Sequence, residues 1–294
     1  REETLASICD GDFSWAGLLE FDEEGRLEKS LYNTITIVDH HKDWGEKIRK
    51  NEFTGAIEWK GSPITDMDEI EIYFKIYNLT GIDNKQWVRD SIVECARKHS
   101  YHPILEKVDN LVWDGEERLQ DFFVRTVGAE DTQVTREVSF RWMCAMYRRV
   151  KHPGCYFDAY IILTDPTQGT GKTKIFEKLT EGLDIRDGHG TTINYTAINA
   201  SPTYNDKDNA MMINSSIITT FDEGSDMKYS KLEKFKSFIS QNTCNLRIPY
   251  EKYNKTIRVH TVFSVTTNDE KFLTDTTSNY ERRAWVLKCH GNPN

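Results

Sequence analysis

Long apolar runs are missing from this chain of 294 residues. The longest, such as Ile161 to Leu163, are far too short to cross a bilayer, and no signal peptide is visible. The sequence therefore predicts no membrane partner and a place in the cytoplasm. The first residue is Arg1 rather than Met, which indicates a fragment of a longer chain.

Paired cysteines are also missing. The six cysteines are widely scattered, with no C-x-x-C motif and no paired histidines nearby: Cys9, Cys95, Cys144, Cys155, Cys244 and Cys289. This pattern predicts reduced thiols and no zinc site.

An excess of positive charge is absent, because the net charge is −9. That value excludes a uniformly basic nucleic-acid binder, but the charge is unevenly spread. Residues 1–30 hold nine acids against three bases, whereas residues 226–260 hold eight bases against three acids. A polyanion should therefore meet the second region.

Internal repeats and low-complexity tracts are absent too, and the length favours about two domains. A break at Lys151-His152-Pro153-Gly154 precedes a segment that alternates strand and helix, as a parallel α/β sheet requires. We predict an N-terminal α+β region over 1–100, a helical linker over 101–150 and an ATPase domain over 151–294.

Periodicity and caps predict helices over 66–78 (Thr65 cap, Gly81 end), 84–98 (Asp83 and Gln86 capping box), 118–126 and 136–150. Trp113 and His102 are interpreted as a packed aromatic and a capping histidine, with ligand contact as the alternative.

The β-branched run Thr34 to Val38 predicts a strand, followed by Asp39-His40-His41. These three residues resemble the signature of metal-dependent phosphoesterases, which need further aspartates. Asp10 and Asp12 are the only candidates, so a solvated junction is the favoured interpretation.

The segment from Tyr160 to Leu179 carries the motif that is most informative about function. An apolar strand enters a loop that ends in Gln168-Gly169-Thr170-Gly171-Lys172-Thr173, and an amphipathic helix follows. The glycines let backbone N–H groups surround phosphate oxygens, Lys172 can reach the β- and γ-phosphates, and the Thr173 hydroxyl can bind Mg²⁺. Pro166 stands where the usual pattern has its first glycine. We therefore predict an ATP and Mg²⁺ site in an α/β P-loop NTPase core.

Two later strands supply the other groups that ATP hydrolysis needs. Asp222 and Glu223 follow the strand-like run 216–221; Asp222 can hold Mg²⁺ and Glu223 can deprotonate the attacking water. Asn268 follows the run 259–265 and can sense the γ-phosphate. The alternatives are an acidic surface turn and a loop asparagine.

Two basic features are candidates for partners. A hairpin over 245–256, which includes Arg247, carries Lys252 and Lys255 interleaved with tyrosines in its turn, which suits a DNA backbone and unstacked bases. Arg282 and Arg283 precede the strand-like run 284–287, and either can serve as an arginine finger for a neighbouring subunit. A solvated turn and a local ion pair are the alternatives.

These motifs together resemble the virulence-associated protein E family of phage and mobile-element replication proteins, related to superfamily 3 helicases of the AAA+ class. The matching pieces are Asn51-Glu52-Phe53, Tyr101-His102-Pro103, Trp113-Asp114-Gly115, Arg118-Leu119, Pro153-Gly154-Cys155, the phosphate loop, Lys236-Ser237-Phe238, Arg247-Ile248-Pro249-Tyr250, Thr266-Thr267-Asn268 and Arg282-Arg283. The departures are Pro166, Thr219-Thr220 in place of an acid, and two extra residues before Arg282.

The resemblance implies a homo-hexameric, ATP-driven DNA helicase in a bacterial host cell, which grips single-stranded or forked DNA with the hairpin. Two other hypotheses stay open. One is a nucleotide-gated origin-binding or loader ATPase that does not unwind, and the other is a phosphoesterase built on Asp39-His40-His41.

Overall fold

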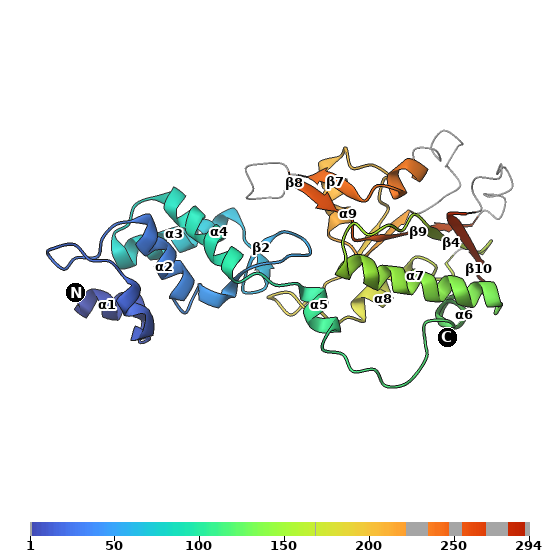
Figure 1. Cartoon of the computed structure of the whole chain (residues 1–294), viewed down its shortest axis with the longest axis horizontal. Helices are drawn as coiled ribbons and strands as arrows, with labels where there is room; N and C mark the ends of the chain where they lie inside the picture. Colours follow the sequence, from blue (N-terminus) through green and yellow to red (C-terminus); the bar gives the residue numbers. More distant parts are fainter. Residues whose placement is uncertain (1, 168, 222–234, 247–254, 269–281, 292–294) are drawn as a thin grey trace. The chain divides into compact units, whose positions relative to one another are not determined.

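A computed structural model describes residues 2–167, 169–221, 235–246, 255–268 and 282–291 (Figure 1). The chain divides into two compact units. The first comprises Arg1–Pro103 with Arg186–Thr191, and the second comprises Ile104–Ile185 with Thr192–Asn294. None of the helices in the described residues is long and apolar enough to span a membrane.

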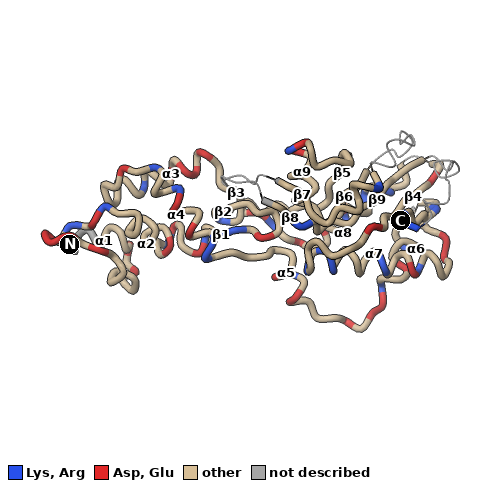
Figure 2. The backbone as a smooth tube through the Cα atoms, turned by 45° about the horizontal axis from the view of Figure 1, so that its top comes forward, with Lys and Arg blue, Asp and Glu red and all other residues tan. Residues whose placement is uncertain are grey.

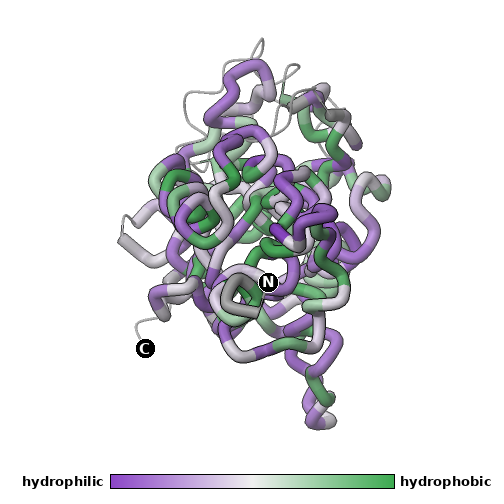
Figure 3. The backbone as a smooth tube through the Cα atoms, turned by 90° about the vertical axis from the view of Figure 1, so that its left-hand side faces the viewer, coloured by the Kyte–Doolittle hydropathy of each residue, from purple (hydrophilic) through white to green (hydrophobic). Residues whose placement is uncertain are grey.

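The first unit packs helices beside a small antiparallel sheet of order β1-β2-β3. Its longer elements are α1 (Glu2–Cys9), α2 (Leu31–His40), α3 (Asp66–Thr80), α4 (Lys85–Lys98), β1 (Ile48–Lys50), β2 (Ile57–Trp59) and β3 (Ser62–Pro63), with short 3-10 helices at Phe13–Leu18 and Gly45–Lys47. In Figure 3 hydrophobic and hydrophilic stretches alternate along the coils, as helices with one buried face require.

The predicted strand over 34–38 is wrong, because these residues lie inside α2. Ser30 caps the helix by accepting a hydrogen bond from the Asn33 N–H at 3.1 Å. The Thr34 and Thr36 hydroxyls donate to carbonyls four residues back, at 2.8 and 3.0 Å, so each polar side chain is satisfied within the helix. Local capping and burial therefore override the β propensity of this run.

The helix over 66–78 is confirmed, with the predicted cap and end. Thr65 and Asp68 form a capping box, and Gly81 closes α3 in the left-handed conformation at φ 68°. The next helix is confirmed as α4, but its predicted cap is wrong. Asn84, not Asp83, accepts the hydrogen bonds from the N–H groups of Gln86 and Trp87.

The second unit is built on a five-stranded parallel sheet of order β10-β4-β9-β6-β5 (Figure 1). Its strands are β4 (Tyr160–Thr164), β5 (Thr196–Ile198), β6 (Ile218–Phe221), β9 (Val262–Thr267) and β10 (Ala284–Lys288). The predicted parallel α/β sheet is confirmed, although β9 begins and ends later than the run 259–265. The antiparallel pair β7 (Thr243–Leu246) and β8 (Lys255–Arg258) confirms the strands of the predicted hairpin.

The second unit includes the helices α5 (Pro103–Val108), α6 (Phe122–Val127), α7 (Gln133–Lys151), α8 (Lys174–Glu181) and α9 (Lys207–Asn214), and residues 235–239 are helical as well. The helix predicted over 118–126 therefore begins four residues later, because residues 118–121 are not helical. The helix predicted over 136–150 is confirmed as α7.

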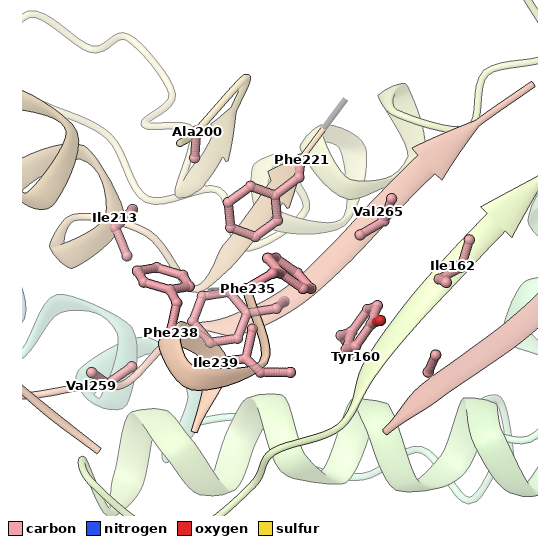
Figure 4. Packing of buried hydrophobic residues seen from close by; sticks show 12 residues of the cluster. Tyr160, Ile162, Ala200, Ile213, Phe221, Phe235, Phe238, Ile239, Val259 and Val265 are labelled. Atoms are coloured by element: carbon pink, nitrogen blue, oxygen red, sulfur yellow. The ribbon is translucent and has the colours of Figure 1, made fainter. Parts of the chain in front are cut away.

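An aromatic cluster forms one face of the sheet core (Figure 4). Phe221 and Phe263 come from neighbouring strands, and Phe235 and Phe238 lie over them, with Phe221 and Phe235 ring centroids 5.0 Å apart. Each buried phenylalanine contributes roughly 1.5–3 kcal/mol relative to an exposed one. This packing holds β6 and β9 side by side, and their C-terminal ends lie at one edge of the sheet.

Hydroxyl pairs explain how the polar strand β6 is buried. Thr219 Oγ1 lies 3.0 Å from Thr261 Oγ1, and Thr220 Oγ1 lies 2.8 Å from Ser264 Oγ. Because each hydroxyl finds a partner in or next to β9, the polar side chains of β6 are buried without unmatched hydrogen-bonding groups.

Candidate functional site

The loop between β4 and α8 lies at the C-terminal edge of the parallel sheet, where ligands bind in open α/β folds. Gly169 and Gly171 adopt φ values of 75° and 82°. A Cβ atom on either would meet no heavy atom within 4 Å, so the left-handed backbone, and not crowding, requires glycine here.

The start of the loop adapts to Pro166. Proline has no N–H, and the next N–H group, that of Thr167, donates instead to Oδ1 of Asp165 at 2.8 Å. Asp165 is 2% exposed, and its Oδ2 atom has no hydrogen-bond partner among the described residues. The aspartate therefore shapes the turn with one oxygen and leaves a second buried acceptor beside the loop.

Lys172 is 8% exposed and its ammonium is surrounded by oxygen atoms. It donates to Oδ1 of Asn268 at 2.8 Å, to Oγ1 of Thr170 at 3.2 Å, and to the carbonyls of Thr167 and Asp165 at 3.2 and 3.3 Å. The structure thus brings together Lys172 and Asn268, which the sequence predicts for the same site. All of these acceptors are protein oxygens, so the ammonium is held at the start of α8 between the loop and the end of β9.

The Thr173 hydroxyl lies 3.2 Å from the Thr266 hydroxyl, so a second pair joins the loop to β9. α8 begins directly after Thr173, and the Ile175 N–H already bonds the Gly171 carbonyl at 3.1 Å. The positive end of the helix therefore faces the loop, as anion binding requires.

The residues that follow β10 pack closely against the loop between β4 and α8. A Cβ on Gly291 would lie 3.2 Å from the Thr170 side chain, and a Cβ on Gly128 would lie 2.6 Å from the Gly291 carbonyl oxygen. Cys289 is buried beside them; burial and the Asp165 carboxylate raise its pKa to about 12, which the Lys172 ammonium partly offsets. Sequence patterns had not indicated this support, because it joins segments distant in the chain.

β6 ends at the same edge of the sheet as β4. Phe221, its last residue, pairs with Val265, and Val265 pairs with Ile162 in β4. Asp222 and Glu223 follow immediately but lie outside the described residues, as does Gln168. Asp206, another acid of this region, caps α9 by accepting from the Asn209 N–H at 2.7 Å.

Arg282 and Arg283 lie at the opposite edge of the sheet. The Arg283 carbonyl accepts from the N–H of Tyr160, the first residue of β4. Lys172 lies in the loop after Thr164, the last residue of β4. A five-residue strand separates these ends by roughly 13–16 Å. Both arginines contact the Asp158 carboxylate, at 3.1 Å for Arg282 and 2.8 Å for Arg283.

The side chains of Arg282 and Arg283 differ in exposure and in the number of contacts they make. The Arg283 side chain is 26% exposed and also donates to the Lys236 carbonyl at 3.3 Å, whereas the Arg282 side chain is 74% exposed. Burial raises the pKa of Asp158, but the Tyr156 hydroxyl and both arginines outweigh it and hold that pKa below its usual value. Arg283 is thus fixed to its own unit, and Arg282 is the one presented to solvent.

The β7–β8 hairpin carries the predicted DNA-binding residues. Arg247 and Lys252 lie outside the described residues, and the Lys255 backbone pairs with Leu246 at the start of β8. Val259, which directly follows β8, donates its N–H to the carbonyl of Asn242, just before β7, and its carbonyl accepts from the N–H of Gly154, after α7.

The Asp39-His40-His41 motif ends a helix and not a strand. Asp39 accepts from Lys98 at 2.6 Å and from His99 Nε2 at 2.9 Å. Burial raises the pKa of Asp39, but these partners outweigh it and hold the pKa below its usual value. His40 contacts the Thr36 carbonyl, and His41 Nδ1 accepts from the Asp43 N–H at 3.1 Å.

One group of possible metal ligands occurs in the described part of the chain: Asp39, Cys95 and His99, with ligand atoms within 4.8 Å of one another. The Asp39 carboxylate already binds an ammonium and an imidazole. Burial also raises the pKa of Cys95 to about 12, so its thiol stays protonated. This group fits an ion pair between α2 and α4 better than a phosphoesterase centre.

Comparison with known proteins gives one family. The model of the virulence-associated protein E-like domain matches residues 105–294. No curated protein matches. Two solved structures of the NrS-1 C-terminal region, both described as A-form apo structures, are similar at 16% identity each, with TM-scores of 0.40 and 0.32. The alignments cover 61% and 70% of this chain, but only 38% and 53% of those chains.

Proposed function

The chain belongs to the virulence-associated protein E-like family, and we propose that it is a P-loop ATPase that translocates on DNA during phage or mobile-element replication. The observation that carries the proposal is the contact of Lys172 with Asn268 at the C-terminal edge of a parallel sheet. It joins a glycine-containing loop, a helix N-terminus and a polar amide from the neighbouring strand at one point.

The nucleotide binds with its phosphates on this loop. Lys172 exchanges its loop carbonyl partners for the β- and γ-phosphate oxygens, and the left-handed backbone at Gly169 and Gly171 turns N–H groups toward them. Gln168 and Thr170 complete the loop. Asn268 keeps its contact with Lys172 and reaches the γ-phosphate.

Mg²⁺ is the cation that suits the oxygen ligands at this edge. The Thr173 hydroxyl, beside Thr266, and the Asp222 carboxylate would hold it, and both are hard oxygen donors. The ion would neutralise charge on the phosphates. Glu223 accepts the proton of the attacking water, since it follows Asp222 after the same strand.

The arginines act on a neighbouring subunit. Because β4 separates them from Lys172 in their own chain, they cannot reach their own γ-phosphate while β10 stays paired with β4. Arg282, exposed at 74%, is the finger, whereas Arg283 is held within its own chain by Asp158 and the Lys236 carbonyl. Such an arrangement needs a ring of copies, for which six is the number that the family resemblance implies.

DNA passes the β7–β8 hairpin, where Arg247, Lys252 and Lys255 meet the phosphate backbone. Translocation is tested by ATP turnover with and without single-stranded DNA, together with displacement of a labelled strand from a fork. Stimulated turnover with displacement supports a helicase. Stimulated turnover without displacement supports the alternative, an origin-binding or loader ATPase, and no turnover at all contradicts both.

A further inference from the structure

The connection between α5 and α6, residues 109–121, exposes large apolar side chains to an unusual degree. Leu111, Val112 and Trp113 are 64%, 92% and 73% exposed. The expectation that Trp113 is packed is therefore wrong; its indole N–H donates only to the nearby Glu116 carbonyl, at 3.2 Å. Three consecutive exposed side chains of this size indicate a contact surface.

This connection, here named the arm, is anchored at both ends on its own α7. Asp109 accepts from Lys151 at 3.3 Å, and the Leu119 carbonyl accepts from the Ser139 hydroxyl at 2.5 Å. Between these anchors the arm bows away from α7, as Figures 1 and 2 both show. Its apolar residues therefore stand on a short, doubly fixed segment and not on a free end.

The outward face of α7 is the matching surface. Phe140 and Tyr147 are each 41% exposed, and Cys144 between them is exposed as well. Arg141, Arg148 and Lys151 are exposed on the same helix; Arg141 pairs with Glu137, and Lys151 pairs with Asp109 at the start of the arm. The face is thus apolar along its centre, with three basic side chains and one acid beside it.

The arm has the opposite charge. It holds five acidic residues and one arginine, and Arg118 is already bound to Asp114 at 2.7 Å. Glu116 and Glu117 remain beside the apolar residues, and the acidic colouring of this stretch is visible in Figure 2. An acidic, apolar segment and a basic, apolar helix face are complementary in both respects.

We propose that the arm docks Leu111, Val112 and Trp113 on the outward face of α7 in a second copy of this chain. Within one chain Asp109 contacts Tyr147 and Lys151 of this face, but Leu111, Val112 and Trp113 stay exposed, as do Phe140 and Cys144. A second copy is therefore the occupant that brings the apolar parts of arm and face together. The contact joins two different surfaces, and contacts of that kind form a ring when the rotation between neighbouring copies closes, or an open filament when it does not. It rests on the proposed function only in requiring copies side by side, and it needs no ATP hydrolysis.

Cysteine cross-linking tests the contact directly, because Cys144 is exposed on the proposed face. A Val112→Cys/Cys144→Ser chain is mixed with the wild-type chain and oxidised mildly. We expect a disulfide-linked pair, absent when both chains carry Cys144→Ser. The Val112→Cys chain alone should give linked oligomers on a non-reducing gel.

Two outcomes overturn the proposal. One is a disulfide formed only within one chain, which places the arm on its own α7. The other is a protein that assembles in solution, with or without ATP, but gives no link. Neither outcome bears on ATP turnover, which is measured separately.

A second measurement does not depend on cysteines. Replacing Leu111, Val112 and Trp113 together with serine should weaken self-association about tenfold or more in sedimentation, the scale of losing a buried tryptophan anchor. Met67→Ser is the control, since Met67 is also 73% exposed but lies on α3 of the other unit. Unchanged association of the triple variant would contradict the proposal.

Discussion

Asn268 accepts a hydrogen bond from the Lys172 ammonium at 2.8 Å, although 96 positions separate the two residues. The contact joins the end of β9 to the loop after β4, and these strands are direct neighbours in the sheet. Under the proposed function, the amide would report on the same phosphate that the lysine binds.

Asn268→Ala should lower ATP turnover roughly 10–100-fold, because Lys172 loses its closest partner and the γ-phosphate loses a polar contact. Affinity for ADP should change little, since ADP lacks the γ-phosphate. Phosphate release and ADP titration measure the two effects. Asn205→Ala, an exposed asparagine outside the site, is the control. If Asn268→Ala and Asn205→Ala hydrolyse ATP equally fast, Asn268 has no part in hydrolysis and only a structural role.

Glu223→Gln keeps the shape of the side chain but removes the base. ATP should still bind while hydrolysis falls by about 10² or more, the usual scale for a general base. Asp206→Asn is the matched control, because Asp206 serves as the cap of α9. If Glu223→Gln and Asp222→Asn both hydrolyse ATP normally, the acidic motif lies elsewhere in the chain.

An Arg282→Ala/Arg283→Ala variant and a Glu223→Gln variant, each inactive alone, should recover activity when mixed, because composite sites then hold one intact copy of each group. Asp158→Asn is the control: it breaks the ion pair that both arginines make in their own chain but keeps the arginines. Turnover by Asp158→Asn should therefore survive. Failure of every mixture, with assembly verified, would assign the arginines to their own subunit.

Lys252→Ala/Lys255→Ala should flatten the dependence of DNA affinity on salt. Each phosphate contact on a single strand contributes a slope of roughly −0.7, and removing two cations reduces the number of contacts. Basal ATP turnover should persist, but its stimulation by DNA should be lost. Fluorescence anisotropy across a salt series measures the slope, with Lys207→Ala/Lys288→Ala as an exposed control pair. If the variant and the wild type show the same salt dependence, DNA binds elsewhere on the protein and not at the hairpin.

The parts of the fold that sequence could predict have local causes. The unit of β4, loop and α8 follows from an apolar strand, two glycines and an amphipathic helix that are consecutive in the sequence. α3 follows from Thr65 and Gly81 at its ends. Asn268 was predicted for the site because it stands at the end of a strand, although its contact with Lys172 depends on the strand order.

The parts that sequence missed depend on tertiary context. Met67, Ile70, Phe74 and Tyr77 predict the α3 helix by their spacing, yet all four are exposed, and Ile72 and Ile76 form the buried face. Periodicity identifies a helix that has two apolar stripes, but not the stripe that packs. Packing likewise keeps the β-branched run of α2 helical, since α2 lies against α4.

The most direct test of the proposed function is ATP hydrolysis by Lys172→Ala beside Lys174→Ala. Both changes remove a lysine from the start of the same helix, but Lys172 is 8% exposed among loop oxygens and Lys174 is exposed. Loss of the only loop cation should lower turnover by at least about 10², with Lys174→Ala unchanged. Circular dichroism verifies that both variants fold. Turnover by a folded Lys172→Ala variant within a fewfold of wild type would contradict the assignment of this loop as the phosphate site.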